Sequence, residues 1–336
     1  MKSQPFGPLD PAHYRESVRR ALAEDFGWGD VTTDATVPAD ARGRGTFLAK
    51  GPCVVAGLDV AAEVFRQLDP AVAFTVHHGD GTYCQPGTVI AVVDGLARPL
   101  LTAERTALNY LLKLSGIATV TRRYVEVAAG RIIVLDTRKT TPGLRLLEKY
   151  AVRAGGGTNH RLALDDGILI KDNHIRLAGG VAVAMASMRA AQCDMPIEIE
   201  AQSLEQLDEA LAAGATRILA DNLSLDELRE VVKRTRGRAQ VEVSGGVTLE
   251  RLDAIADTGS RVRVGGRADP LGAGRRHQLR DRASVITTGA EPAPRDDRRG
   301  RSRSSGRRVD ARRQRAARTL RGRPAAARES AAANQR

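Results

Sequence analysis

The sequence lacks an apolar run of 18 or more residues, so it predicts no membrane-spanning helix. Its N-terminus also lacks the apolar stretch and small-residue cleavage site of a secretory signal. Cysteine is scarce, since Cys53, Cys84 and Cys193 are scattered, odd in number and without metal or redox spacing. These absences predict a reduced, cytoplasmic protein with no membrane partner. The 336 residues, of which 42% are hydrophobic, are enough for a large core and two domains.

Lysine is absent from residues 267–336, although the whole chain carries a net charge of +12. This tail contains 20 Arg and 7 acidic residues, which gives it a charge of +13 and leaves residues 1–266 at −1. A body so close to neutrality does not have the basic face of a nucleic-acid-binding domain. The tail has almost no apolar periodicity and no aromatic residue to stack on bases, so we expect a disordered segment, and this composition does not favour nucleic-acid binding.

From about residue 132 the chain alternates short β-branched runs with amphipathic segments. The runs read IIVLD, GILIK, IEIEA, RILAD, QVEVS and RVRVGG. One helix is expected over about 175–191, and others are expected to follow the N-cap residues Ser203, Ser224 and Thr248. This alternation predicts a parallel sheet with crossover helices.

Each of these strands ends in a polar or small residue. The six residues are Asp136, Lys171, Glu200, Asp221, Ser244 and Gly265. An open sheet collects functional groups mainly where its strand order reverses, whereas a barrel directs one from every strand end into a single mouth. Because six strands are fewer than eight, we predict an α/β protein with an incomplete, TIM-like α/β barrel over residues 116–266.

Residues 1–115 follow a different pattern, with turn signals at HHGDG and QPG between strand-like runs, and predict an α+β domain. This domain closes with the helix LTAERTALNYLLKLSGIA, for which Thr102 is the expected N-cap. Arg105 lies in this helix on the apolar row of Leu101 and Leu108. A cation at that position either extends its charged head to the edge of the apolar surface or meets a partner.

The strand that ends at Asp136 runs directly into the polar segment TRKTTPG. Two adjacent cations at the end of a buried strand are costly unless an anion lies above them. The groups expected at the same mouth are the cations Arg138, Lys139, His160, Arg161 and Lys171, the carboxylates Glu200 and Asp221, and the small donors Thr137, Ser244, Gly245 and Gly246. Arg binds planar carboxylates through two bonds, and free backbone N–H groups at a helix start bind phosphate. The set predicts a multiply anionic substrate, with carboxylates suited to Mg²⁺ or to sugar hydroxyls.

Single members of this set also have ordinary structural explanations. His160 alone is typical of a hydrogen-bonded structural histidine, and Glu200 fits a solvated strand position equally well. The SGG sequence alone is a weak signal for phosphate. The TRKTTPG segment is the strongest of the signals.

Seven segments together resemble the quinolinate phosphoribosyltransferase family, the carboxylating nicotinate-nucleotide pyrophosphorylases of NAD biosynthesis. They are EDFGWGDVTT (24–33), LTAERTALNYLLKLSGIAT (101–119), LDTRKTTPGLRLLEKYAVRAGGGTNHR (135–161), LIKDNHI (169–175), IEIEA (197–201), LADNLS (219–224) and VEVSGGV (241–247). The resemblance covers roughly residues 10–266.

This resemblance implies a subunit of two domains, 1–115 and 116–266, and a homodimer in which Arg105 reaches the barrel mouth of the second copy. The implied ligands of the pyridine dicarboxylate quinolinate are Arg105, Arg138, His160, Arg161 and Lys171. The implied ligands of phosphoribosyl pyrophosphate and its Mg²⁺ are Lys139, Glu200, Asp221, Ser244, Gly245 and Gly246, with Thr137 and Gly265 also expected to bind substrate. The catalytic residues would be Lys139, Lys171, Glu200 and Asp221, and the metal ligands Glu200 and Asp221.

The reaction implied is transfer of phosphoribosyl to the ring nitrogen of quinolinate, with loss of pyrophosphate, and then decarboxylation to nicotinate mononucleotide. The residues alone leave three alternatives open. They are a related phosphoribosyltransferase, a barrel lyase that uses Lys139 or Lys171 as a Schiff base, and nucleic-acid binding through the tail.

The resemblance ends near residues 265–267, where RADPLGAGRRHQL replaces the family's closing turn and helix. Read one nucleotide out of register, these residues are codon-compatible with ALTHSAPAVAIN, which resembles the family's ending. We therefore expect a reading-frame shift at this point, in the gene or in the sequence record. A chain without the closing helix would expose apolar surface and lose stability.

Overall fold

The computed structural model describes residues 6–258, 263–265 and 291–292. The chain divides into two units, 1–293 and 294–336, and all the described residues belong to the first. Apart from residues 291–292, the tail expected to be disordered and the expected frame shift after Gly265 lie outside the described residues. None of the described helices is long and apolar enough to cross a membrane.

The N-terminal part combines an antiparallel sheet with helices. Its elements are the 3-10 helix Pro11–His13, α1 (Arg15–Phe26), α2 (Val31–Thr36), β1 (Arg42–Leu48), β2 (Cys53–Val54), α3 (Leu58–Leu68), β3 (Ala73–Val76), β4 (Tyr83–Cys84), β5 (Val89–Leu96) and α4 (Ala97–Ala128). One sheet has the order β12-β1-β5-β3, in which β12 is Glu291–Pro292, and β2 pairs with β4. Apolar residues of α1, α3, α4 and these strands form one core, around Phe47, Phe65 and Leu111. The predicted α+β architecture is therefore confirmed.

The second part alternates strands and helices. Its elements are β6 (Ile133–Val134), α5 (Arg145–Ala154), β7 (Ile168–Ile170), α6 (Asp172–Ala178), α7 (Val181–Ala190), β8 (Ile197–Ala201), α8 (Leu204–Ala212), β9 (Arg217–Asp221), α9 (Leu225–Thr235), β10 (Gln240–Ser244), α10 (Leu249–Ala256) and β11 (Arg263–Gly265). All six strands are parallel, in the order β6-β11-β10-β9-β8-β7. Among the described strands β6 and β7 are the two edges, so the sheet does not close, as an incomplete barrel requires.

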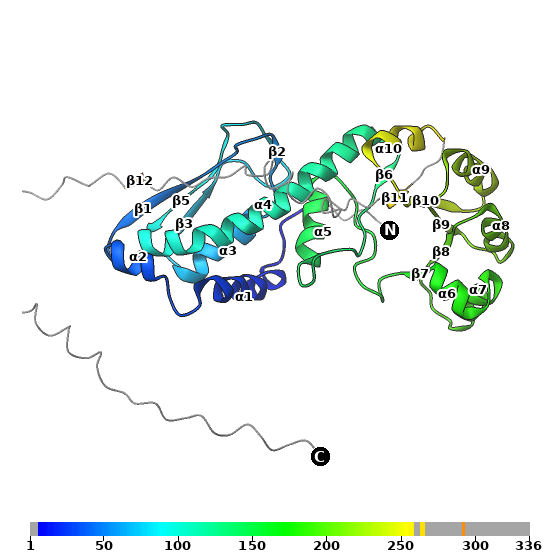
Figure 1. Ribbon diagram of the computed structural model, residues 1–336, viewed down its shortest axis with the longest axis horizontal. Helices are drawn as coiled ribbons and strands as arrows, with labels where there is room; N and C mark the ends of the chain where they lie inside the picture. The colour runs from blue at the N-terminus through cyan, green and yellow to red at the C-terminus, as the bar shows by residue number, and fades with distance from the viewer. Residues whose placement is uncertain (1–5, 259–262, 266–290, 293–336) are drawn as a thin grey trace, which may run out of the picture. The chain divides into compact units, whose positions relative to one another are not determined.

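Among the described elements, helices α7–α10 cover one face of this sheet (Figure 1). Residues such as Ile199, Ile218 and Val243 are buried against α7–α10 in a second core. Because side chains alternate along a strand, the neighbours of these residues point to the opposite, inner face. Ser203, Ser224 and Thr248 each accept a hydrogen bond from the third residue of the helix that follows, which confirms the expected N-caps.

Two helix predictions were wrong. Helix α4 begins at Ala97, directly after β5, and Leu96 precedes it without a side-chain cap. Thr102 therefore lies inside the helix, where its hydroxyl donates to Asp30 Oδ2 at 3.0 Å. The expected single helix over 175–191 is two helices, because Gly179 and Gly180 both have positive φ and end α6 before α7 begins.

Helix α4 is the element shared by the two cores. Its first part contributes Leu108, Leu111 and Leu114 to the N-terminal core, and its last part contributes Ala128 to the core behind the parallel sheet. Thirty-two residues of continuous helix thus join both cores through one rigid element. The domain boundary expected at residue 115/116 falls inside this helix.

Candidate active site

Alternation along β8 and β10 places acidic residues on the inner face of the parallel sheet. Glu198 and Glu200 are two residues apart on β8, and Glu242 and Ser244 are two residues apart on β10. The three glutamates are buried, with 6–8% of each residue exposed. At the carboxyl ends of β9, β10 and β11 the register pairs Asp221 with Ser244, and Ser244 with Gly265. The strand ends predicted from the sequence therefore lie along one edge of the sheet.

Asp136, at the end of the β6 segment, organises the chain around it. Its carboxylate is buried, forms an ion pair with Lys149 (Nζ–Oδ1 2.5 Å) and accepts from Asn159 Nδ2 at 2.6 Å. It also accepts the backbone N–H of His160 at 2.8 Å. These bonds connect the strand end, α5 and the loop at 159–160, and so fix the segments that carry the predicted cations. The sequence singled out Asp136 but not its partner.

Two arginines, in the loops that follow β6 and α5, form the cationic part of the site. Arg161 is 8% exposed and donates from Nη1 to Gly167 O at 3.1 Å. Burial lowers the pKa of Arg161, and the neighbouring charge of Arg138 lowers it further. The Nε atom of Arg138 is buried without a hydrogen-bond partner among the described residues. A pair of adjacent guanidinium groups with an unused buried donor suits a dianionic ligand.

The acidic part contains Glu200 and Asp221, with the cation Lys171 nearby. Burial raises the pKa of Glu200, and the nearby Asp221 carboxylate raises it further. Lys171 acts in the opposite direction on the same group, and Gln202 donates to Glu200 Oε1 at 2.9 Å. The structure therefore brings these predicted residues within electrostatic reach of one another. Two carboxylates that repel each other can share a hard cation that prefers oxygen ligands, such as Mg²⁺.

The turn after β10 has the backbone form that the sequence suggested for a phosphate site. Gly245 and Gly246 have φ of +83° and +59°. A Cβ built on Gly245 would lie 2.1 Å from Asn222 Oδ1 and 2.7 Å from Asn222 N, so no larger residue fits there without displacing the chain. Helix α10 follows this turn, and its free N–H groups add to the potential for binding anions.

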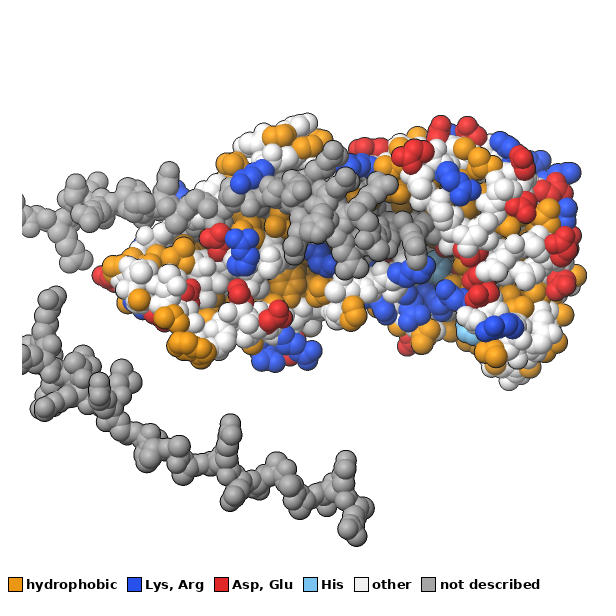
Figure 2. Space-filling model, in the orientation of Figure 1, with side chains coloured by type: hydrophobic (Ala, Val, Ile, Leu, Met, Phe, Trp, Pro, Cys, Tyr) orange, Lys and Arg blue, Asp and Glu red, His pale blue; other side chains and the backbone are white. Residues whose placement is uncertain are grey.

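The other predicted residues lie further from these groups or at the surface. Lys139 is exposed, and its N–H donates to Thr137 Oγ1 at 3.1 Å. Arg105 is exposed on α4, and within the described residues its guanidinium has neither a hydrogen bond nor an ion pair. Among the described residues, no hydrogen bond or ion pair therefore joins Arg105 to the predicted site residues of its own chain. Figure 2 shows Lys and Arg side chains gathered between the places at which Figure 1 labels α5 and β7.

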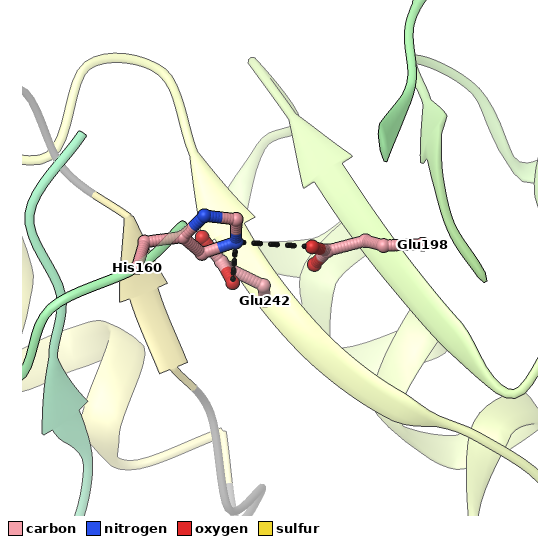
Figure 3. A group of neighbouring side chains, drawn as sticks. All are labelled: His160, Glu198 and Glu242. Atoms are coloured by element: carbon pink, nitrogen blue, oxygen red, sulfur yellow. Dashed lines mark hydrogen bonds and ion pairs between the residues drawn. The ribbon is translucent and has the colours of Figure 1, made fainter. Parts of the chain in front are cut away.

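Two residues of the inner face were missed from the sequence. His160 Nε2 lies 3.1 Å from Glu198 Oε2 and 3.5 Å from Glu242 Oε2 (Figure 3). The alternation in IEIEA and QVEVS could have predicted them, because Glu198 lies on the same face of the sheet as Glu200, and Glu242 on the same face as Ser244. All three side chains line a cavity of about 330 Å³. Lys139, Glu200, Asp221 and Ser244 do not line this cavity, which lies toward the beginnings of β9 and β10.

Comparison with known proteins identifies the family. Residues 30–115 match the model of the quinolinate phosphoribosyl transferase N-terminal domain, and residues 117–268 match that of its C-terminal domain. The chain belongs to the quinolinate phosphoribosyltransferase family. A relative from Synechocystis, named as a probable carboxylating nicotinate-nucleotide pyrophosphorylase, is 45% identical over 247 residues, which cover 72% of this chain and 83% of the relative.

Further relatives agree with this family assignment. The nicotinate-nucleotide pyrophosphorylase of Mycobacterium leprae is 46% identical over 252 residues, 73% of this chain and 89% of the relative. The solved structure of the nicotinate-nucleotide pyrophosphorylase of Francisella tularensis superposes with a TM-score of 0.76 at 34% identity. It covers 86% of this chain and 99% of that chain. These comparisons confirm three expectations from the sequence, namely the quinolinate phosphoribosyltransferase family, the α/β fold and the pentosyltransferase class.

Proposed function

We propose that this chain transfers phosphoribosyl from phosphoribosyl pyrophosphate to quinolinate with decarboxylation, giving nicotinate mononucleotide, pyrophosphate and CO₂ for NAD biosynthesis. The observation that carries the proposal is the match of both family domains over residues 30–268. The inner face of the sheet supports it, because cationic and acidic groups lie there on adjacent strand ends. The cytoplasmic location expected from the sequence belongs to the same proposal.

The quinolinate part of the site rests on the cations. Arg138 and Arg161 are close enough to lower the pKa of Arg161, and each guanidinium can bind one carboxylate of a dicarboxylate. We place His160 and Lys171 with them, and Arg105 of a second copy. A ring that lacks the second carboxylate would leave part of this charge unpaired, so these residues select quinolinate over pyridine monocarboxylates.

The phosphoribosyl part of the site rests on the acids and the glycine turn. Transfer of the ribosyl group builds positive charge at the sugar carbon, which Glu200 and Asp221 would offset. Ser244, Gly245 and Gly246 would bind the 5′-phosphate through their N–H groups, and Lys139 would neutralise the departing pyrophosphate. The later loss of CO₂ needs an electron sink, which the pyridinium ring supplies, so the protein mainly positions the ring.

Glu200 and Asp221 are the residues that we propose hold Mg²⁺. Their oxygen donors and mutual repulsion fit this ion, as described above. When bound, it would neutralise phosphate charge. Chelation with EDTA should therefore abolish turnover, and added Mg²⁺ should restore it.

We also propose a homodimer, because Arg105 is exposed and lies beside exposed apolar side chains. Leu101, one turn earlier on α4, is 38% exposed, and Trp28 and Val31 are 89% and 56% exposed. The segment 28–31 adjoins α4, since Thr102 donates to Asp30. An apolar surface around a cation of the site is the kind of surface that a second copy covers.

The test of function is direct. Purified full-length protein is mixed with quinolinate, phosphoribosyl pyrophosphate and Mg²⁺, and nicotinate mononucleotide and CO₂ are measured. We expect both products in equal amounts, and none when nicotinate replaces quinolinate. Folded protein that gives no product would contradict the proposal.

A further inference from the structure

The ring of His160 is held from one side by two carboxylates on different strands. Its Nε2 lies 3.1 Å from Glu198 of β8 and 3.5 Å from Glu242 of β10. The three side chains are 15%, 10% and 8% exposed. Figure 3 shows Nε2 directed at both carboxylates and the second ring nitrogen, Nδ1, turned away from them. The ring therefore has one nitrogen committed to the protein and one that is not.

The backbone of His160 is held as tightly as its ring. Its N–H donates to Asp136 Oδ1 at 2.8 Å, and its C=O accepts from Lys149 Nζ at 3.0 Å. The buried pair Asp136–Lys149 thus holds this residue at two points. A histidine that only fills space does not need its backbone and its ring fixed by four charged groups.

Nδ1 is the part of the ring left to act on a ligand. Among the described residues no hydrogen bond reaches it. An imidazole whose Nε2–H is shared by two carboxylates favours the charged form, in which Nδ1 also carries a proton. Burial alone lowers the pKa of His160, but the hydrogen bonds to Glu198 and Glu242 outweigh it and raise this pKa to about 9.

We propose that Glu198 and Glu242 are positioning residues, which bind the Nε2–H of His160 and so present its Nδ1–H as a fixed donor to a carboxylate of the substrate. This inference rests on the proposed function for the identity of that substrate. In this proposal the two glutamates on the inner face keep His160 protonated and prevent its ring from rotating. Glu198 and Glu242 themselves do not touch the ligand.

The same three residues have a second possible use. The ligand atoms of His160, Glu198 and Glu242 all lie within 4.8 Å of one another, which is close enough for one cation. The short contacts favour the hydrogen-bonded arrangement, because Nε2 already points at both carboxylates. A metal at this position would occupy Nε2 and displace its proton, so metal binding is an outcome that the test must detect.

The test compares the isosteric variants Glu198→Gln and Glu242→Gln with wild type and with Glu209→Gln. Glu209 is an exposed residue of α8 and serves as the matched control. We expect KM for quinolinate to rise on the order of tenfold in each of the first two variants, the usual effect of losing one charged hydrogen bond. KM for phosphoribosyl pyrophosphate should stay within twofold, since its binding groups are elsewhere.

A spectroscopic measurement separates positioning from folding. In ¹⁵N-histidine-labelled protein at pH 7.5, His160 is assigned by its loss in His160→Asn. Wild type and Glu209→Gln should show both ring nitrogens protonated, and Glu242→Gln should shift His160 toward the neutral ring. Should Glu242→Gln not fold, Glu198→Gln gives the same readout.

Three outcomes distinguish the possible failures. Wild type that turns over quinolinate, with both variants unchanged in KM and in ¹⁵N signals, would overturn the inference alone. Wild type that is folded but inactive would contradict the proposed function. The ¹⁵N comparison would still test whether Glu198 and Glu242 hold His160 in the protonated form. Stoichiometric Zn²⁺ binding that both Gln variants lose would show a metal site and overturn the positioning role.

Discussion

Asp136 and Lys149 form an ion pair whose side chains are both buried. Burial is the main cause that raises the pKa of Asp136 and lowers that of Lys149. Removing one partner leaves a buried charge without its counter-charge, which costs about 3–5 kcal/mol. We predict that Asp136→Asn lowers the free energy of unfolding by that amount in urea titration.

Two further variants test this explanation of Asp136. Asp226→Asn removes an exposed partner of Arg229 and should change stability by less than about 0.5 kcal/mol. Adding Lys149→Met to Asp136→Asn should recover part of the loss, because no unpaired charge then remains. A loss of less than about 1 kcal/mol in Asp136→Asn would show that the pair contributes little.

Residues at strand ends could be anticipated because their position follows from local pattern. Asp221 and Ser244 end the strands β9 and β10, Glu200 is the last polar residue of β8, and parallel strands bring their ends to one edge. Glu198 and Glu242 lie in the middle of β8 and β10, where a buried glutamate is unusual. The neighbouring sequence does not indicate which residue each of them contacts. Their partner, His160, lies in a loop 38 and 82 positions away in the chain, and only the folded sheet brings the three together.

At the scale of elements, the turn between β10 and α10 depends on one glycine more than on the others. Gly245 combines a φ of +83° with backbone of Asn222 only 2.7 Å from any added Cβ. We predict that Gly245→Ala costs about 1–3 kcal/mol and raises KM for phosphoribosyl pyrophosphate, because the turn must move. Urea titration and steady-state kinetics measure the two effects.

The matched control for this turn is Gly237→Ala. Gly237 has a similar φ of +73°, but a Cβ there would meet no atom within 4 Å. Its substitution should cost about 1 kcal/mol from the backbone conformation alone and leave KM unchanged. Equal effects of the two substitutions would mean that the close approach to Asn222 has no role.

Element boundaries were harder to anticipate than element order. The alternation of strand-like and helix-like segments predicted the parallel sheet, and the hydroxyl N-cap residues predicted where α8, α9 and α10 begin. The start of α4 could not be found this way, because the helix continues from β5 without a side-chain cap. Its first turn is stabilised by packing of Leu100 into the N-terminal core, a tertiary effect that no local pattern contains.

At the scale of the whole molecule, Arg105 decides whether one chain is a complete enzyme. It is exposed on α4, and the Arg138 with which it would act follows β6. We predict that Arg105→Ala and Arg138→Ala each lower turnover more than about 100-fold, since each removes a charged contact with the dicarboxylate.

Doubly tagged dimers with one variant in each subunit then locate the action of Arg105. If Arg105 serves the site of the second copy, the dimer holds one intact site, formed by Arg138 of one subunit and Arg105 of the other. Its turnover should be about half that of wild type. If Arg105 serves its own chain, both sites lack a guanidinium and the mixed dimer stays inactive. Recovery of activity would therefore establish the shared site, and a monomer by light scattering would exclude it.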